Sequence, residues 1–219
     1  MELKGKKINF LGDSITEGCG TTENDKIFLN VLKEECELKE ARNYGIGGTR
    51  IAHQEPVNFG EAFCVRYKEM DDDADVIVVF GGTNDYGHGK APMGEFCDKT
   101  IFTFYGACRV LIEGLIEKYP NSEIVFMTPL HRTNEINSEE KKNLGTEYIS
   151  AVNPLKKYVD VIKEVCEYYS VPVLDLYSVS GIQPNVDVIK ELYCPDGLHP
   201  NDLGHIKIKN KLKAFFKNL

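Results

Sequence analysis

Short apolar runs separated by polar or glycine-containing turns recur along the chain. β-branched and other apolar residues dominate four runs, each bounded by Gly, Pro, Asn or Asp: Lys7–Leu11, Asp75–Phe80, Glu123–Thr128 and Val171–Leu176. Runs of this length, apolar at nearly every position, are typical of buried parallel strands. A shorter run near Ala41–Tyr44 predicts a fifth strand.

Segments with a helical spacing of apolar residues lie between and after these strands. They cover Phe28–Lys39, Ile101–Lys118, Pro154–Tyr169 and Asp202–Lys217. Alternation of strand and helix predicts an α/β fold, a three-layer α/β/α sandwich around a flavodoxin-like, five-stranded parallel sheet. No repeat or linker-like stretch interrupts the pattern, so we expect one domain over residues 1–219.

Three long irregular stretches begin where a predicted strand ends. They are residues 46–73, 81–99 and 129–153. Loops of this length in a small domain are more often functional than idle, and ligands of such folds bind beyond the carboxyl ends of the strands. We therefore expect the functional site to lie among these loops.

Charge and cysteine content exclude several classes of protein. Lys and Arg total 26 against 34 Asp and Glu, a net charge of -8, and no basic cluster is present. Nucleic acid is therefore not an expected partner, since phosphate binding needs concentrated positive charge. Seven cysteines without a CxxC pair indicate reduced thiols and no zinc site, and the acidic run at residues 71–75 is interpreted as a solvated turn. We expect no metal and no other cofactor.

The chain also shows no membrane or export signal in its sequence. Its first residues pass from charged positions directly into a short apolar strand, and no apolar stretch reaches the roughly 20 residues of a membrane helix. The expectation is a cytoplasmic protein with no membrane span, of undetermined oligomeric state.

Four segments carry candidate chemistry. Ser14 follows the first strand within Gly12-Asp13-Ser14-Ile15-Thr16. A serine in this place is often only a helix cap, but a tight glycine turn also exposes a nucleophilic hydroxyl and aims backbone amides at a carbonyl. The glycines of residues 43–49 fail the dinucleotide pattern because position 50 is Arg50, which leaves close approach to a ligand or a plain turn as their function.

The other two segments supply polar groups. Asn84 lies in Gly81-Gly82-Thr83-Asn84-Asp85 at the end of a strand, where it either shapes a turn or donates its amide to an oxyanion. Asp196 and His199 lie three residues apart before the last helix, a spacing that allows the carboxylate to orient the imidazole, although such a pair is also common at surfaces and helix caps.

The segments GDSI, NYGIGG, GGTND and DGLHP, in this order and at these spacings, resemble the four blocks of the SGNH or GDSL hydrolase family. The resemblance spans nearly the whole chain and implies a serine esterase. It implies Ser14 as nucleophile, His199 as base and Asp196 as the residue that orients it. The oxyanion hole is implied to consist of the Ser14 and Gly48 amides and the Asn84 side chain. Ile15 replaces the family's leucine without a chemical consequence, and the absence of GxSxG around Ser14 excludes an ordinary α/β-hydrolase.

The substrate is open at this point. The family acts on acetylated sugars, short esters, lysophospholipids and thioesters, so the resemblance implies only a small-molecule ester. Polar residues in the loops favour a short acyl group on a polar or carbohydrate substrate, with His53, Tyr86, His88 and Arg132 as expected contacts. Alternatives are a longer acyl chain held by Phe59, Phe63 and Phe96, acyl transfer to an alcohol, or a catalytically silent carbohydrate-binding module.

Overall fold

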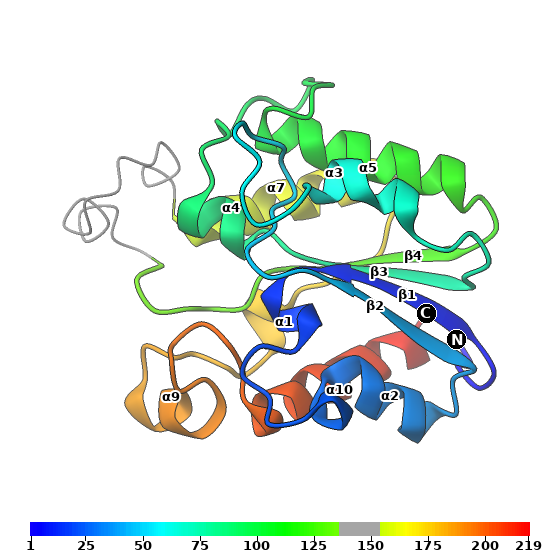
Figure 1. Ribbon diagram of the computed structural model, residues 1–219, viewed down its shortest axis with the longest axis vertical. Helices are drawn as coiled ribbons and strands as arrows, with labels where there is room; N and C mark the ends of the chain where they lie inside the picture. Colours follow the sequence, from blue (N-terminus) through cyan, green and yellow to red (C-terminus); the bar gives the residue numbers. More distant parts are fainter. Residues whose placement is uncertain (136–153) are drawn as a thin grey trace.

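A five-stranded parallel sheet forms the centre of the molecule in the computed structural model (Figure 1), which describes residues 1–135 and 154–219. The strands are β1 (Lys7–Gly12), β2 (Glu40–Gly45), β3 (Val76–Phe80), β4 (Glu123–Met127) and β5 (Val173–Leu174). Their order in the sheet is β2-β1-β3-β4-β5. The fold class predicted from the alternating pattern is confirmed.

Helices cover both faces of the sheet (Figure 1). One face carries α3 (Phe63–Arg66), α4 (Thr83–His88), α5 (Phe104–Lys118) and α7 (Leu155–Tyr168). The opposite face carries α1 (Ser14–Glu17), α2 (Phe28–Cys36), α9 (Asp187–Tyr193) and α10 (Asp202–Lys217). The short elements η1 (Asn24–Lys26), η2 (Tyr67–Glu69) and α8 (Leu176–Val179) complete the connections.

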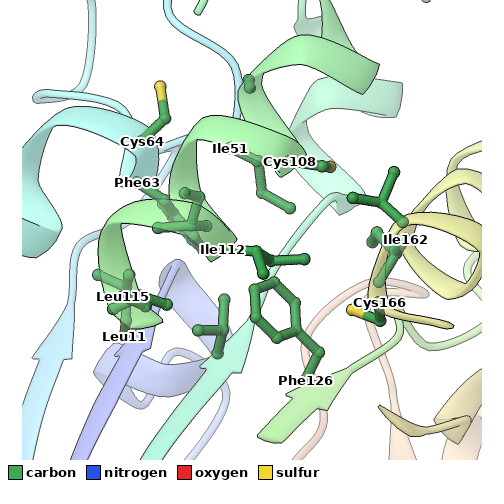
Figure 2. Close-up of a cluster of buried hydrophobic side chains, with 14 of the residues drawn as sticks. Leu11, Ile51, Phe63, Cys64, Cys108, Ile112, Leu115, Phe126, Ile162 and Cys166 are labelled. Atoms are coloured by element: carbon green, nitrogen blue, oxygen red, sulfur yellow. The ribbon is translucent and has the colours of Figure 1, made fainter. Parts of the chain in front are cut away.

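The apolar core is split by the sheet, because successive side chains of a strand point to opposite faces. Leu11 of β1 and Phe126 of β4 face α5 and α7, where Ile112 and Ile162 close around them (Figure 2). Phe10, the residue before Leu11 in β1, points to the opposite face of the sheet and belongs to the second core, which it forms with α2 and α10. All five side chains are nearly or fully buried, and complete burial of such a side chain contributes about 1.5–3 kcal/mol.

Several predicted boundaries are corrected by local structure. The helix expected to reach Lys39 ends at Cys36, because Glu37 adopts a left-handed conformation (φ 51°) that terminates it. The helix expected from Ile101 begins at Phe104, after the Thr103 side chain caps it. The strand expected over residues 171–176 is only two residues long, since the Asp175 side chain caps α8.

Two of the stretches expected to be irregular contain helices. Residues 46–73 include α3 and η2, and residues 81–99 begin with α4. Most of the third stretch, residues 136–153, lies outside the described residues. In the part of the chain that the structure describes, no helix combines the length and apolar character needed to cross a bilayer. The seven cysteines are all free thiols.

A buried histidine of α10 links this helix to the start of α2 on the same side of the sheet. His205 is fully buried, and its Nδ1 accepts a hydrogen bond of 3.1 Å from the Phe28 amide. Burial lowers the pKa of His205 to about 4, although Asp202 acts in the opposite direction. The native protein therefore keeps this imidazole neutral under conditions where an unfolded chain would protonate it.

This burial predicts a pH dependence of stability. Between pH 6.5 and pH 4 the unfolded chain binds a proton at His205 that the native state does not, so stability falls as the pH falls through this window. The loss attributable to His205 is about 3 kcal/mol. We expect His205→Asn, which keeps an acceptor for Phe28, to lose less stability between pH 7.5 and pH 4.5 in urea unfolding than the wild type. Equal losses in both proteins would contradict the assignment.

Candidate active site

The register of the sheet brings the candidate segments to one edge. Gly12 of β1 is paired with Gly45 of β2 and with Phe80 of β3. The residues that follow these three strands, Ser14, the loop of residues 46–52 and Asn84, therefore emerge side by side. Position 12 also requires glycine, because a Cβ there would lie 2.0 Å from the Thr16 hydroxyl oxygen.

Ser14, His199 and Asp196 form one hydrogen-bonded line. The Ser14 Oγ lies 3.0 Å from His199 Nε2, and His199 Nδ1 lies 2.6 Å from Asp196 Oδ2. Ser14 is the first residue of α1, which Asp13 caps by accepting a 3.0 Å hydrogen bond from the Ile15 amide. This arrangement has the geometry of a serine, its general base and the carboxylate that orients the base.

The Asp196 carboxylate is held from two sides. Its Oδ1 accepts hydrogen bonds from the backbone amides of Leu198 (2.8 Å) and His199 (2.7 Å), while Oδ2 faces the imidazole. Partial burial acts to raise the pKa of Asp196, but these hydrogen bonds outweigh it and keep the pKa below the ordinary value. The carboxylate is therefore ionised at neutral pH and oriented toward Nδ1.

A second carboxylate lies beside the nucleophile and was not singled out from the sequence. Asp13 is buried, and burial raises its pKa to about 7 despite the Ile15 hydrogen bond and the positive charges of Arg66 and Arg132. Its position directly before Ser14 in the GDSI motif was the feature of the sequence that could have pointed to it. We assign Asp13 to positioning of α1, since its carboxylate contacts the helix backbone.

The loop of residues 46–52, which contains Gly48, passes close to Ser14. Gly48 has φ +76°, and a Cβ there would lie 2.6 Å from the ring of Phe59, so glycine is required on both counts. At Gly47 a Cβ would lie 3.8 Å from the Cβ of Ser14, which shows how closely the loop approaches the serine. Within residues 1–135 and 154–219, neither the Ser14 amide nor the Gly48 amide has an acceptor.

Side chains from three helices, α1, α4 and α3, hold this loop in place. Glu17 accepts from the Gly47 amide at 2.8 Å, and the Asp85 carboxylate accepts from the Ile51 and Ala52 amides at 2.9 Å each. Arg66, buried under the loop, donates to Gly12 O and to the Thr49 hydroxyl. Asp85 is the last residue of the GGTND motif, so its importance could have been inferred from the sequence. Nothing in the local sequence around Arg66 indicated that it supports the loop.

Asn84 lies next to the loop, with its amide already engaged on one side. Its Nδ2 donates a 3.0 Å hydrogen bond to the Thr49 carbonyl, and the side chain is buried. A primary amide carries two N–H donors, so one remains for a ligand while the other fixes the orientation of the group. The role of Asn84 in an oxyanion hole stays a prediction, in which the N–H that is not bonded to Thr49 would donate to the oxyanion.

The residues expected to contact substrate fall in different places. Tyr86 is buried, and its hydroxyl donates to the Asn134 carbonyl, so the surface contact expected from the sequence is corrected to a core position. His53 faces Glu55, Glu61 and the ring of Phe102. His88 contacts Arg50 and lies with its ring tilted against that of Phe59, which covers Gly48. Arg132 follows β4 and reaches the start of α4.

The apolar groove considered for a long acyl chain is not formed by the three phenylalanines named for it. Phe63 is fully buried in the core, under Gly81. Phe96 packs against Arg109 and Tyr168, while Phe59 is 64% exposed above Gly48. Phe63 is inside the core and Phe96 packs at the edge of the same core, so Phe63 offers no surface to an acyl chain.

A parallel α/β/α sandwich with a serine, histidine and aspartate aligned at the carboxyl edge of its sheet has the geometry of a hydrolase. Residues 10–206 match the GDSL-like Lipase/Acylhydrolase family, to which the chain belongs. The family resemblance found in the sequence is thereby confirmed. No curated protein sequence matches the chain.

Solved structures show the same fold over the whole chain. A protein from Lactobacillus plantarum is 31% identical, with a TM-score of 0.82 and coverage of 98% of each chain. A carbohydrate acetylesterase family member from Sinorhizobium meliloti is 16% identical, with a TM-score of 0.66 and coverage of 97% of each chain. A two-domain esterase active on acetylated mannans is 18% identical, with a TM-score of 0.62, and matches 99% of this chain and 50% of its own.

Proposed function

We propose that the protein is a serine esterase that removes an acetyl or other short acyl group from a polar, carbohydrate-like substrate. The observation that carries this proposal is the line from Ser14 Oγ through His199 to Asp196, with distances of 3.0 Å and 2.6 Å. Family membership supports ester hydrolysis, and two fold relatives described as acetylesterases of carbohydrates support the choice of substrate class.

The proposed reaction has two halves. His199 Nε2 accepts the proton of Ser14 as Oγ attacks the ester carbonyl, and the tetrahedral oxyanion is bound by the Ser14 and Gly48 amides and Asn84. The imidazolium then returns the proton to the leaving alcohol. Water attacks the acyl-enzyme by the same route, while Asp196 stays ionised and keeps the imidazole in the required tautomer.

A longer acyl chain is the second candidate substrate. The complete burial of Phe63 argues against it, since a side chain inside the core cannot line a groove for an acyl chain.

Two measurements test the proposal. A fluorophosphonate probe should label the wild-type protein at Ser14, as identified by peptide mass analysis. A series of p-nitrophenyl esters from acetate to decanoate, together with acetylated sugars, should show the highest kcat/KM for the shortest acyl groups. Absence of labelling would exclude the serine mechanism, and a maximum at eight or more carbons would exclude the short-acyl substrate.

Asn84 is expected to contribute to catalysis through the transition state. Its second N–H would bind a charge that exists only in the tetrahedral intermediate, so Asn84→Ala should lower kcat and kcat/KM together by about 100-fold to 1000-fold with little change in KM. Melting temperature measured on the same sample separates this loss from unfolding.

Asn43→Ala is the matched control for Asn84→Ala. Asn43 also donates its amide to a backbone carbonyl beside the site, Thr16 O at 2.8 Å, but is assigned no contact with the reacting ester. We expect the control to lose stability while the folded fraction keeps kcat within a few-fold of the wild type. A stable Asn84→Ala protein with near-normal kcat would remove Asn84 from the site.

A further inference from the structure

Arg132 lies between the two segments that supply the Asn84 amide and the Asp196–His199 pair. Its Nη1 is 3.2 Å from both the carbonyl and the hydroxyl oxygen of Thr83, the residue before Asn84. The next residue, Thr133, donates its amide to the Gly197 carbonyl at 2.9 Å, inside the segment that carries Asp196 and His199. The guanidinium is therefore a neighbour of the proposed reaction centre.

The positive charge of Arg132 is paired with none of the carboxylates that the structure describes. Among the described residues, no carboxylate lies within ion-pair distance of the guanidinium. Nε is enclosed without an acceptor, and Nη2 makes no hydrogen bond in residues 1–135 and 154–219. Burial lowers the pKa of Arg132, although Tyr86, Asp13 and Asp196 act in the opposite direction. A partly buried cation without a paired anion is costly for a folded protein.

The nearby carboxylates are bound to other donors. Asp13 accepts from the Ile15 amide, and Asp196 accepts from His199 and Leu198. By contrast, Arg109, another partly buried arginine, rests on the rings of Phe96 and Tyr168, donates to the Tyr169 hydroxyl and lies 3.7 Å from Glu113. Arg132 also lies over an aromatic ring, that of Tyr86 at 5.6 Å, but no described carboxylate pairs with its charge as Glu113 does with Arg109, so its surroundings suit a binding group.

We infer that Arg132 binds an anionic group of the substrate, a carboxylate or a phosphate, carried on the polar part of the ester. This inference rests on the proposed esterase function and narrows its substrate class from polar to acidic esters. A guanidinium suits either anion because its planar set of N–H donors matches their oxygens. A purely structural role, in which Arg132 only holds the start of α4, predicts a loss of stability without discrimination by substrate charge.

Three substrates with the same reacting group test the inference. They are acetylated glucuronic acid, the acetylated primary amide of that acid as the neutral ester, and acetylated glucose 6-phosphate. The wild type should hydrolyse at least one of the charged substrates with about 10-fold to 100-fold higher kcat/KM than the neutral ester, mainly through a lower KM, as expected for one hydrogen bond to a charged group. The charged substrate that is preferred identifies the anion as carboxylate or phosphate.

Arg132→Met, which keeps an unbranched side chain as far as the Nε position but removes the guanidinium charge, should abolish this preference, so that kcat/KM for the charged substrate falls to the value for the neutral ester. Arg109→Met is the control and should retain the preference. Equal rates on charged and neutral esters in a wild type that still reacts with fluorophosphonate would overturn the inference alone, as would a preference that persists in Arg132→Met. Absence of fluorophosphonate labelling would instead overturn the proposed function and the inference with it. Because the wild-type comparison requires no variant, instability of Arg132→Met does not affect it.

Discussion

Ser14→Ala is expected to lower kcat by about a million-fold, the loss that follows removal of a triad nucleophile. The physical reason is that Ser14 Oγ is the atom within 3.0 Å of His199 Nε2, so that no acyl-enzyme forms without it. The measurement is kcat on p-nitrophenyl acetate together with fluorophosphonate labelling, which should disappear.

Ser178→Ala is the control for the loss of a serine hydroxyl. Ser178 is exposed at the start of α8, where its hydroxyl donates to Asp175 at 2.9 Å. Its removal should leave kcat and labelling unchanged. The hydroxyl of Ser14 contacts only His199 within the described residues, so Ser14→Ala should fold normally. A folded Ser14→Ala protein that kept a tenth of the activity would refute the nucleophile assignment.

Asp196→Asn is expected to lower kcat by about 10,000-fold while leaving the fold intact. The amide oxygen of asparagine can still accept from the Leu198 and His199 amides, so the segment keeps its shape. Its NH₂ group, however, would face His199 Nδ1 as a donor and stabilise the tautomer with the proton on Nε2, which cannot accept the proton of Ser14. The test is kcat with near-unchanged melting temperature.

Asp202→Asn provides a control for the loss of one negative charge near the site. Asp202 begins α10 and accepts hydrogen bonds from the amide and hydroxyl of Thr22, with no contact to His199. We expect a change in kcat of less than a few-fold for this variant. If Asp202→Asn and Asp196→Asn lost activity equally, the effect would be one of general electrostatics, and the tautomer argument for Asp196 would fail.

Local pattern was sufficient to predict most of the secondary structure and the family. Apolar runs such as Val76–Phe80 are buried on both faces by helices, so their composition alone indicates a parallel sheet. The link between Asp196 and His199 was also readable, because residues three apart on one turn are close in any fold. Boundaries were less predictable where one side chain decided them, as with Glu37 and Asp175.

Contacts between distant segments depended on the tertiary structure. Ser14 and His199 are 185 residues apart, and only the crossover connections of the sheet bring them within 3.0 Å. The same reason explains why the sequence did not indicate the burial of Tyr86 and Phe63 or the support of the loop by Arg66. The surroundings of these side chains are formed by elements that are distant in sequence. The sequence by itself therefore determined the strands, the family and the residue types of the site. The tertiary structure decided which of those residues meet, and within residues 1–135 and 154–219 it places no counter-ion against the Arg132 guanidinium beside them.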